Sequence, residues 1–154
     1  MMMDTGRNNW RVPREFMGEI WAETTLENSG DRIRSQAGDI AKEKIRRCHI
    51  RAMVDTGART LALPEEIVAE LGLTVRTGIP VRYADGRREV RPVAGPVTIE
   101  ILGRPMIADC IVLPEGTEPL IGQIILERLD LVADCANETL APNPASPETP
   151  LIRV

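Results

Sequence analysis

The sequence predicts an all-β fold, a sandwich or a closed barrel of short strands, with one or two short helices. Apolar and polar residues alternate in several short segments, as they do in strands with one buried face. Turn sequences such as Asn-Ser-Gly-Asp and Asp-Gly separate these segments at short intervals. The chain has 154 residues, 43% of them apolar, which fits one domain around a single core. Many short strands in a chain of this length are typical of a sandwich or a barrel.

The first part of the chain predicts two long strands. Residues 20–26 alternate between apolar and polar side chains, and turn residues end this strand. Residues 31–44 are charged and weakly patterned, which leaves open a long surface loop or a short helix around 37–44. Residues 45–54 form the second predicted strand, in which His49 falls on the polar face. We therefore expect His49 to be a solvated strand residue.

The remaining elements are short, and proline or glycine marks several of their ends. Pro64 suits the first turn of a helix, and Gly72 suits the end of that helix. The Asp85-Gly86 pair between alternating segments is a strong hairpin signal. The expected elements are strands or short apolar runs at 60–63, 79–83, 88–93, 97–101, 106–113, 120–122 and 131–135, and helices at 64–72 and 123–129.

The composition divides the chain into three parts. Residues 1–16 are polar without periodicity and predict a disordered leader, residues 17–136 hold the expected elements, and residues 137–154 carry four prolines and predict a flexible tail. The start lacks the apolar core of a signal peptide, and no run of about 18 apolar residues occurs. Three cysteines without a CxxC pair fit a reducing compartment. We therefore expect a cytoplasmic protein with no membrane partner.

Charge and composition exclude several classes of function. The net charge of −4 and an aromatic content of 3% provide neither the basic face nor the stacking platforms of a nucleic-acid-binding protein. His49 is the only histidine, which excludes metal sites built from two or three histidines. We therefore expect no nucleic-acid partner, no metal and no cofactor.

The candidate site is the turn that follows the second predicted strand. Asp55 comes directly after an apolar strand, Thr56 offers a hydroxyl, Gly57 permits a close backbone approach and Ala58 keeps the loop small. By itself this triplet is also an ordinary Asx turn. A second Asp-Thr-Gly begins at Asp4, but no strand precedes it, and we interpret it as coincidence.

The order of motifs resembles the retropepsin-like aspartic proteases, and most of all their small cellular bacterial members. Over residues 18–135, an apolar strand leads into Asp-Thr-Gly-Ala at Asp55, a hairpin with Asp85-Gly86 at its tip follows, and the Leu-Ile-Gly run at 120–122 precedes a short helix. The resemblance implies a small closed acid-protease-like barrel. It also implies that each chain supplies one aspartate and that two chains form one site.

The same resemblance implies a role for each motif residue. Asp55 would be catalytic, Thr56 would hydrogen-bond to the loop of the partner, and Gly57 and Ala58 would complete the active-site loop. A flap over the cleft would comprise Tyr83, Ala84, Asp85, Gly86 and Arg87. The residues packed behind the active-site loop would be Leu120, Ile121 and Gly122.

The predicted function is therefore an aspartic endopeptidase that acts as a homodimer on a peptide or protein substrate. Peptide hydrolysis requires one carboxylate to take a proton from water and a second to protonate the carbonyl, and one aspartate cannot do both. Two carboxylates at about 3 Å cannot both stay ionised, so the pair shares one proton and positions a shared water as nucleophile. The partners we expect are a second copy of the chain and the substrate.

Two other interpretations remain open. Viral members of the resembled family commonly carry an Asp and an Arg that pair at the positions of Arg59 and Gln123, and their flaps are apolar rather than charged. These departures favour a catalytically silent retropepsin-like domain that binds or assembles with a partner. The third interpretation is an unrelated small β-barrel in which Asp55 lies in an ordinary turn.

Overall fold

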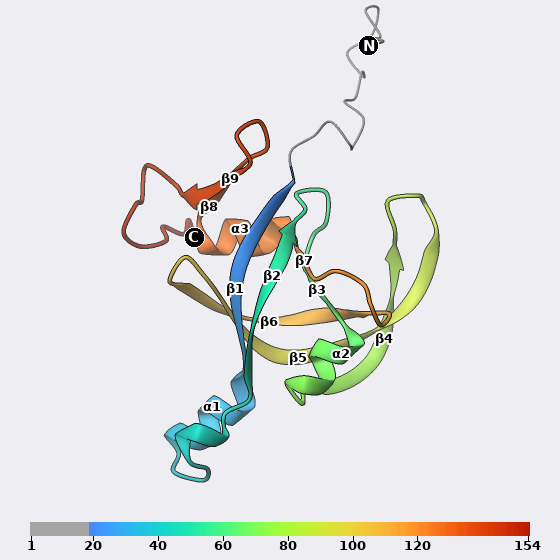
Figure 1. The fold of residues 1–154 in the computed structure, drawn as a ribbon, viewed down its shortest axis with the longest axis vertical. Helices are drawn as coiled ribbons and strands as arrows, with labels where there is room; N and C mark the ends of the chain where they lie inside the picture. The colour runs from blue at the N-terminus through green and yellow to red at the C-terminus, as the bar shows by residue number, and fades with distance from the viewer. Residues whose placement is uncertain (1–18) are drawn as a thin grey trace, which may run out of the picture.

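The computed structural model describes residues 19–154, and six of its strands close into a barrel (Figure 1). The strand order is β1-β2-β7-β3-β6-β5, pairing of β1 with β5 closes the ring, and β4 extends the sheet beyond β5. The predicted closed all-β barrel is confirmed, whereas the predicted leader at 1–16 lies outside the described residues. The strands are β1 (Ile20–Asn28), β2 (Arg47–Val54), β3 (Leu61–Pro64), β4 (Thr74–Arg82), β5 (Arg88–Ile101), β6 (Arg104–Leu113), β7 (Leu120–Ile121), β8 (Leu131–Asp134) and β9 (Thr139–Pro142).

Three short helices and one 3-10 turn accompany the strands. They are α1 (Ser29–Gln36), η2 (Lys42–Lys44), α2 (Glu65–Glu70) and α3 (Gln123–Leu129). None of the helices in the described part of the chain has the length and apolar character needed to cross a membrane. The predicted helices after Pro64 and at 123–129 are present, and α1 is an additional one.

The core forms because alternate strand residues turn inward. On β1, Ala22 and Leu26 are buried while Glu23 between them is exposed. From outside the ring, α3 adds Ile125 and Leu129 to the same cluster of buried side chains. Burying a side chain of this size stabilises the fold by roughly 1.5–3 kcal/mol before the entropic cost.

The outer face of β1 and β2 is polar, as the sequence predicts. Thr25 lies opposite His49 in the antiparallel pairing of the two strands. His49 is exposed, and its Nε2 lies 2.9 Å from Glu23 Oε2. His49 is therefore a solvated strand residue.

The first departure from the sequence prediction lies directly after β1, where α1 takes the place of a turn. Asn28 caps this helix, because its Oδ1 accepts a hydrogen bond from the Asp31 N–H at 2.9 Å. Its Nδ2 donates to the Leu71 carbonyl at 2.8 Å, which ties the cap to the chain after α2. Of the two possibilities for residues 37–44, the structure has mostly loop, with only the 3-10 turn at Lys42–Lys44. The residue types that end a strand in a turn also cap helices, and the sequence does not separate the two.

The second departure is that β5 is one strand of 14 residues where the sequence predicts two. Its pairing with β6 shifts register between Ala94 and Val97 and continues on both sides. Pro96 lies within this irregularity and has no N–H to donate to a ladder. The apolar alternation breaks at the proline, although the strand does not.

The segment from Asn137, for which the sequence predicts a flexible tail, contributes β9 to a hairpin with β8. The buried Arg104 side chain holds the chain on either side of this hairpin. It donates to the carbonyl of Asp130 at 3.0 Å and to that of Ser146 at 2.6 Å. The hairpin is thereby attached to the barrel through β6.

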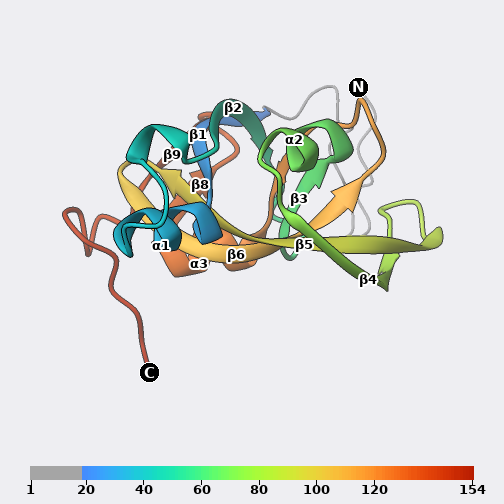
Figure 2. The ribbon, with the colours of Figure 1, turned by 90° about the horizontal axis from the view of Figure 1, so that it is seen from below.

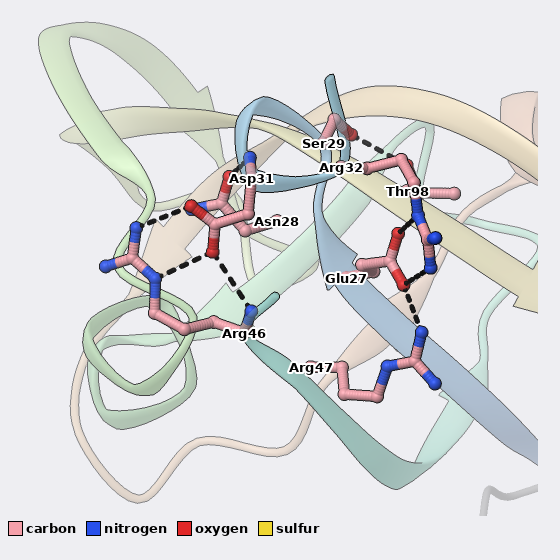
Figure 3. A network of polar contacts seen from close by, with 8 residues as sticks. All are labelled: Glu27, Asn28, Ser29, Asp31, Arg32, Arg46, Arg47 and Thr98. Carbon is pink, nitrogen blue, oxygen red and sulfur yellow. Dashed lines mark hydrogen bonds and ion pairs between the residues drawn. The ribbon is translucent and has the colours of Figure 1, made fainter. Parts of the chain in front are cut away.

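Two buried carboxylates join α1 to β1 and β2 (Figure 3). Asp31 Oδ2 accepts hydrogen bonds from Arg46 Nε at 2.9 Å and from the Arg46 N–H at 3.0 Å, and Oδ1 accepts from Nη2 at 2.9 Å. Glu27 binds Arg32 through both oxygens, at 2.7 and 2.8 Å, and Arg47 at 2.6 Å. The side-chain hydrogen bonds from Arg46 lower the pKa of Asp31 from 3.8 to about 2, against the opposing effect of burial.

Asp31 therefore links the stability of the fold to pH. We expect Asp31→Asn to lower the free energy of unfolding at neutral pH by about 2 kcal/mol, because it removes the charged partner of Arg46. The wild-type pair stabilises the folded chain above the unfolded pKa and loses this contribution as pH falls from about 4 to about 2. Urea unfolding followed by circular dichroism across this range measures both effects.

The matched control is Asp39→Asn. Asp39 is exposed, and its carboxylate has no ion pair within the described part of the chain. We expect this variant to unfold like the wild type at every pH. Equal losses of stability for the two variants would contradict the role given to Asp31.

Candidate active site

The short strand β7 lies between β2 and β3, the strands on either side of the Asp loop (residues 55–60). It runs parallel to β2, where Ile121 lies opposite Val54, and antiparallel to β3. The Asp55 N–H donates to the Ile121 carbonyl at 3.0 Å, which continues the pairing into the loop. Leu120 and Ile121 thus lie directly behind the start of the Asp loop.

Gly122 allows α3 to begin against the far end of the Asp loop. The Gln123 N–H donates to the Ala58 carbonyl and the Ile124 N–H to the Arg59 carbonyl, both at 2.9 Å. A Cβ on Gly122 would lie 2.5 Å from the loop backbone. Its φ of −90° suits any residue, so glycine is required here for space. The first amides of α3 therefore bind the far end of the Asp loop, whereas β7 binds its start.

The Asp55 side chain is half-buried at the start of this loop. Its Oδ1 accepts a hydrogen bond from the Gly57 N–H at 2.9 Å, and its carbonyl accepts one from the Ala58 N–H at 3.1 Å. Within the described residues, neither Oδ2 nor the hydroxyl of the exposed Thr56 has a hydrogen-bonding partner. The loop therefore presents one carboxylate oxygen and one hydroxyl that further groups can contact.

The predicted hairpin around Asp85-Gly86 is present, and it projects from the barrel as the end of β4 and β5 (Figures 1 and 2). We refer to its tip as the flap. The Tyr83 N–H donates to the Arg87 carbonyl, and the Gly86 N–H to the Tyr83 carbonyl, both at 2.9 Å. Asp85 Oδ1 accepts from the Arg87 N–H at 2.9 Å. Gly86 has a φ of +87°, the left-handed conformation that favours glycine, and Ala84 is exposed beside it.

A chain of polar contacts links the flap to the barrel wall. The Tyr83 hydroxyl donates to Glu89 Oε2 at 3.0 Å, and the Arg87 guanidinium lies 4.5 Å from the Tyr83 ring centroid. Glu89 Oε1 accepts from Arg91 Nη1 at 3.2 Å, and Arg91 Nε donates to the Val112 carbonyl of β6 at 2.8 Å. Burial, followed by the hydrogen bond to Glu89, raises the pKa of Tyr83.

A groove of about 800 Å³ extends from the Asp loop to the flap, and its lining begins at Gly57, two residues after Asp55. Tyr83 and Arg87 contribute to it from the flap. Its apolar walls include Ala62, Ile79, Val81, Ile111, Leu113 and Leu120. Its charged lining residues are Arg59, Arg82, Arg87 and Glu89. The structure thus brings the predicted loop, part of the predicted flap and Leu120 to one concave surface.

Sequence reasoning missed Arg82 and Glu89 as residues of this surface, and it missed the contact by which Arg91, which does not line the groove, binds Glu89. The position of the Asp85-Gly86 turn sets the hairpin register, which places Arg82 opposite Arg88. That register was available from the sequence. The contact of Arg91 with β6 was not, because it depends on the packing of strands distant in the sequence.

Cys48 and Cys110 are not activated thiols, and the described residues offer no group of side chains for a metal centre. They contain no group of three His, Cys, Asp or Glu side chains that could hold a metal ion. Burial raises the pKa of Cys48 to about 11 and that of Cys110 to about 12, so both remain thiols at neutral pH. The chemistry available on the Asp loop is acid–base catalysis by a carboxylate.

Because Gly122 lies so close to the loop backbone, we expect a larger side chain at this position to destabilise the fold. We expect Gly122→Ala to lower the free energy of unfolding by about 3 kcal/mol, because backbone atoms of the loop must move. Gly103→Ala is the control, since Gly103 has open space around it and a φ of +77°, and we expect it to cost about 1 kcal/mol from backbone strain alone. Urea unfolding compares the two, and equal costs would contradict the steric role of Gly122.

The single tyrosine of the chain reports directly on the flap. We expect the phenol of Tyr83 to ionise above its ordinary pKa of 10.0, and Glu89→Gln to lower that pKa because it removes the adjacent negative charge. Ultraviolet absorbance of the phenolate during a pH titration measures it. Asp85→Asn, a flap carboxylate that does not contact the hydroxyl, should leave the titration nearly unchanged. An unaltered titration in Glu89→Gln would contradict the contact.

Comparison with known proteins agrees with this geometry. The family described as gag-polyprotein putative aspartyl protease matches residues 41–128, more than half of the chain. The EIAV protease in complex with the inhibitor HBY-793 is 18% identical, has a TM-score of 0.51, and the match covers 75% of this chain and 92% of that chain. The retroviral protease-like domain of Ddi1 from Leishmania major is 16% identical with a TM-score of 0.49, covering 82% and 90%. No curated protein matches the chain.

The matched family region contains the Asp loop, the flap, β7 and most of α3. At 18% identity the EIAV protease shows a shared fold. The interpretation as an unrelated small barrel is therefore wrong. The chain belongs to the gag-polyprotein putative aspartyl protease family, and its fold is that of the retropepsin-like aspartic proteases.

Proposed function

We propose that this protein is an aspartic endopeptidase that acts as a homodimer, with Asp55 from each copy in one active site. The observation that carries the proposal is the position of Asp55. Its loop is fixed at both ends, by β7 and by α3, and it lies at one end of the groove that reaches the flap. The family match supports aspartate-based peptide hydrolysis.

The chemistry requires the second copy. An ionised carboxylate takes a proton from water as its oxygen attacks the peptide carbonyl carbon, and a protonated carboxyl donates to the carbonyl oxygen. One Asp55 per chain supplies only one of these groups. Two copies related by a twofold axis supply both, and their proximity makes the pair share a single proton. Such an axis requires the same surface on both copies, including the exposed Thr56 hydroxyl beside Asp55.

Substrate would lie extended in the groove. The apolar walls exclude water, and an extended peptide exposes backbone groups that pair with strand edges regardless of its sequence. β4 is the edge strand of the large sheet and forms one side of the flap hairpin. A flap that closes over the peptide would separate the reaction from bulk water.

A specific observation supports a second candidate, a catalytically silent domain that binds or assembles with a partner. Arg59 in the Asp loop and Gln123 at the start of α3 bear no opposite charges that could pair. The flap carries Asp85 and Arg87 at its tip. In this alternative the groove binds a protein segment and Asp55 performs no chemistry.

The decisive comparison is wild type against Asp55→Asn on an unstructured protein substrate at mildly acidic pH. We expect Asp55→Asn to lower cleavage by about a thousandfold, because the amide neither accepts nor donates the required proton. Asp39→Asn, at an exposed carboxylate remote from the Asp loop in sequence, is the control and should cleave like the wild type.

Equal cleavage by wild type and Asp55→Asn would end the protease proposal. Absence of cleavage, together with equal retention of a bound partner by both proteins, would favour the silent domain. Detectable turnover that depends on Asp55 would exclude it. Circular dichroism of each variant verifies that the barrel is intact.

A further inference from the structure

The charged lining of the groove is positive in a chain that is negative overall. Three arginines and one glutamate line the groove, Arg59, Arg82, Arg87 and Glu89, whereas the whole chain carries a net charge of −4. The sole carboxylate among them is already occupied. Glu89 accepts from the Tyr83 hydroxyl through one oxygen and from Arg91 through the other. The groove therefore offers cationic groups to whatever enters it.

The backbone of Arg59 is held by a hydrogen bond, and its side chain is exposed. Its carbonyl accepts a hydrogen bond from the Ile124 N–H at 2.9 Å, so the start of α3 fixes its position within the Asp loop. Its side chain is exposed, and no carboxylate of the described residues pairs with it. Arg59 thus places a positive charge close to the proposed site of bond cleavage.

Arg82 lies at the base of the flap in an unfavourable electrostatic setting. It is directly opposite Arg88 in the pairing of β4 with β5. Like charges at directly opposed positions destabilise an antiparallel pair. No carboxylate within residues 19–154 pairs with either side chain. An anionic group bound beside Arg82 would offset this repulsion and favour an ordered flap.

From these features we infer that the groove selects acidic peptides, with apolar side chains against its walls and a flanking Asp or Glu side chain near Arg59 or Arg82. The expected preference in cleavage rests on the proposed function, whereas the expected preference in binding follows from the charges of the groove alone. Apolar contacts supply most of the buried area. The arginines supply the discrimination, because a lysine-bearing peptide would meet like charges.

The test uses three short synthetic peptides that share two central apolar residues and carry Glu, Gln or Lys on both flanks. We expect kcat/KM of the wild type to be about tenfold higher for the Glu peptide than for the Gln peptide, and lowest for the Lys peptide. The double variant Arg59→Glu/Arg82→Glu should reverse this order. The preference should weaken as salt concentration rises, because the arginines are exposed.

The control for added negative charge is Arg153→Glu, an exposed residue next to the C-terminus. Figure 1 shows the C-terminus on the other side of the barrel from the flap hairpin. This variant should keep the wild-type order of peptides. If the double variant Arg59→Glu/Arg82→Glu does not fold, the milder double variant Arg59→Gln/Arg82→Gln replaces it, with circular dichroism to verify the fold. It should reduce the ratio of kcat/KM between the Glu and Gln peptides to near unity.

Binding of the same labelled peptides to Asp55→Asn, by fluorescence anisotropy, separates this inference from the proposed reaction. Tighter binding of the Glu peptide to Asp55→Asn, with no cleavage of any of the three peptides by the wild type, would support the acidic preference and favour the silent domain over the protease. Asp55-dependent cleavage with equal kcat/KM for the three peptides would overturn the preference and leave the protease proposal intact. Failure of all three peptides to bind, or an unchanged order in the double variant, would also overturn it.

Discussion

The insertion of β7 between β2 and β3 is the constraint on which the rest of the structure depends. β7 closes the barrel at that point, and the Asp55 N–H extends its pairing to the first residue of the Asp loop. Gly122 then lets α3 begin so close to the loop that its first amides bind the Ala58 and Arg59 carbonyls. One short apolar segment thus contributes to the core, positions the carboxylate and limits the motion of the loop that carries it.

Polar side-chain contacts connect the flap to this framework. A chain of hydrogen bonds runs from the tip of the hairpin through Tyr83, Glu89 and Arg91 to the Val112 carbonyl in the barrel wall. Hydrogen bonds of this kind have defined directions, so the flap is given one preferred position over the groove. They are also partly exposed and individually weak, so that position can change when a ligand binds.

Local alternation and turn residues predict an all-β chain, the helices after Pro64 and at 123–129, and the hairpin at Asp85-Gly86. They leave a sandwich and a closed barrel open, and the resemblance implies the barrel that the structure shows. The sequence does not predict α1, since Asn28 is equally suited to a turn and to a helix cap; in the structure its Oδ1 caps α1 and its Nδ2 binds the Leu71 carbonyl. The position of β7 behind the Asp loop was expected from the resemblance alone. The hairpin register around Asp85-Gly86 places Arg82 and Glu89 and could have been read from the sequence, whereas the contact of Arg91 with the Val112 carbonyl depends on packing between strands distant in the sequence.

The proposed binding of a peptide involves one copy of this chain, whereas the proposed catalysis requires two. In the proposed function, the groove, the flap and the arginines of one copy would suffice to bind an extended segment. Catalysis needs two carboxylates, and one copy has one on its Asp loop. The protease and the silent binding domain therefore share the same fold and the same groove. What separates them is whether a second Asp55 is brought alongside the first, which makes the interface between copies, rather than the barrel, the determinant of activity.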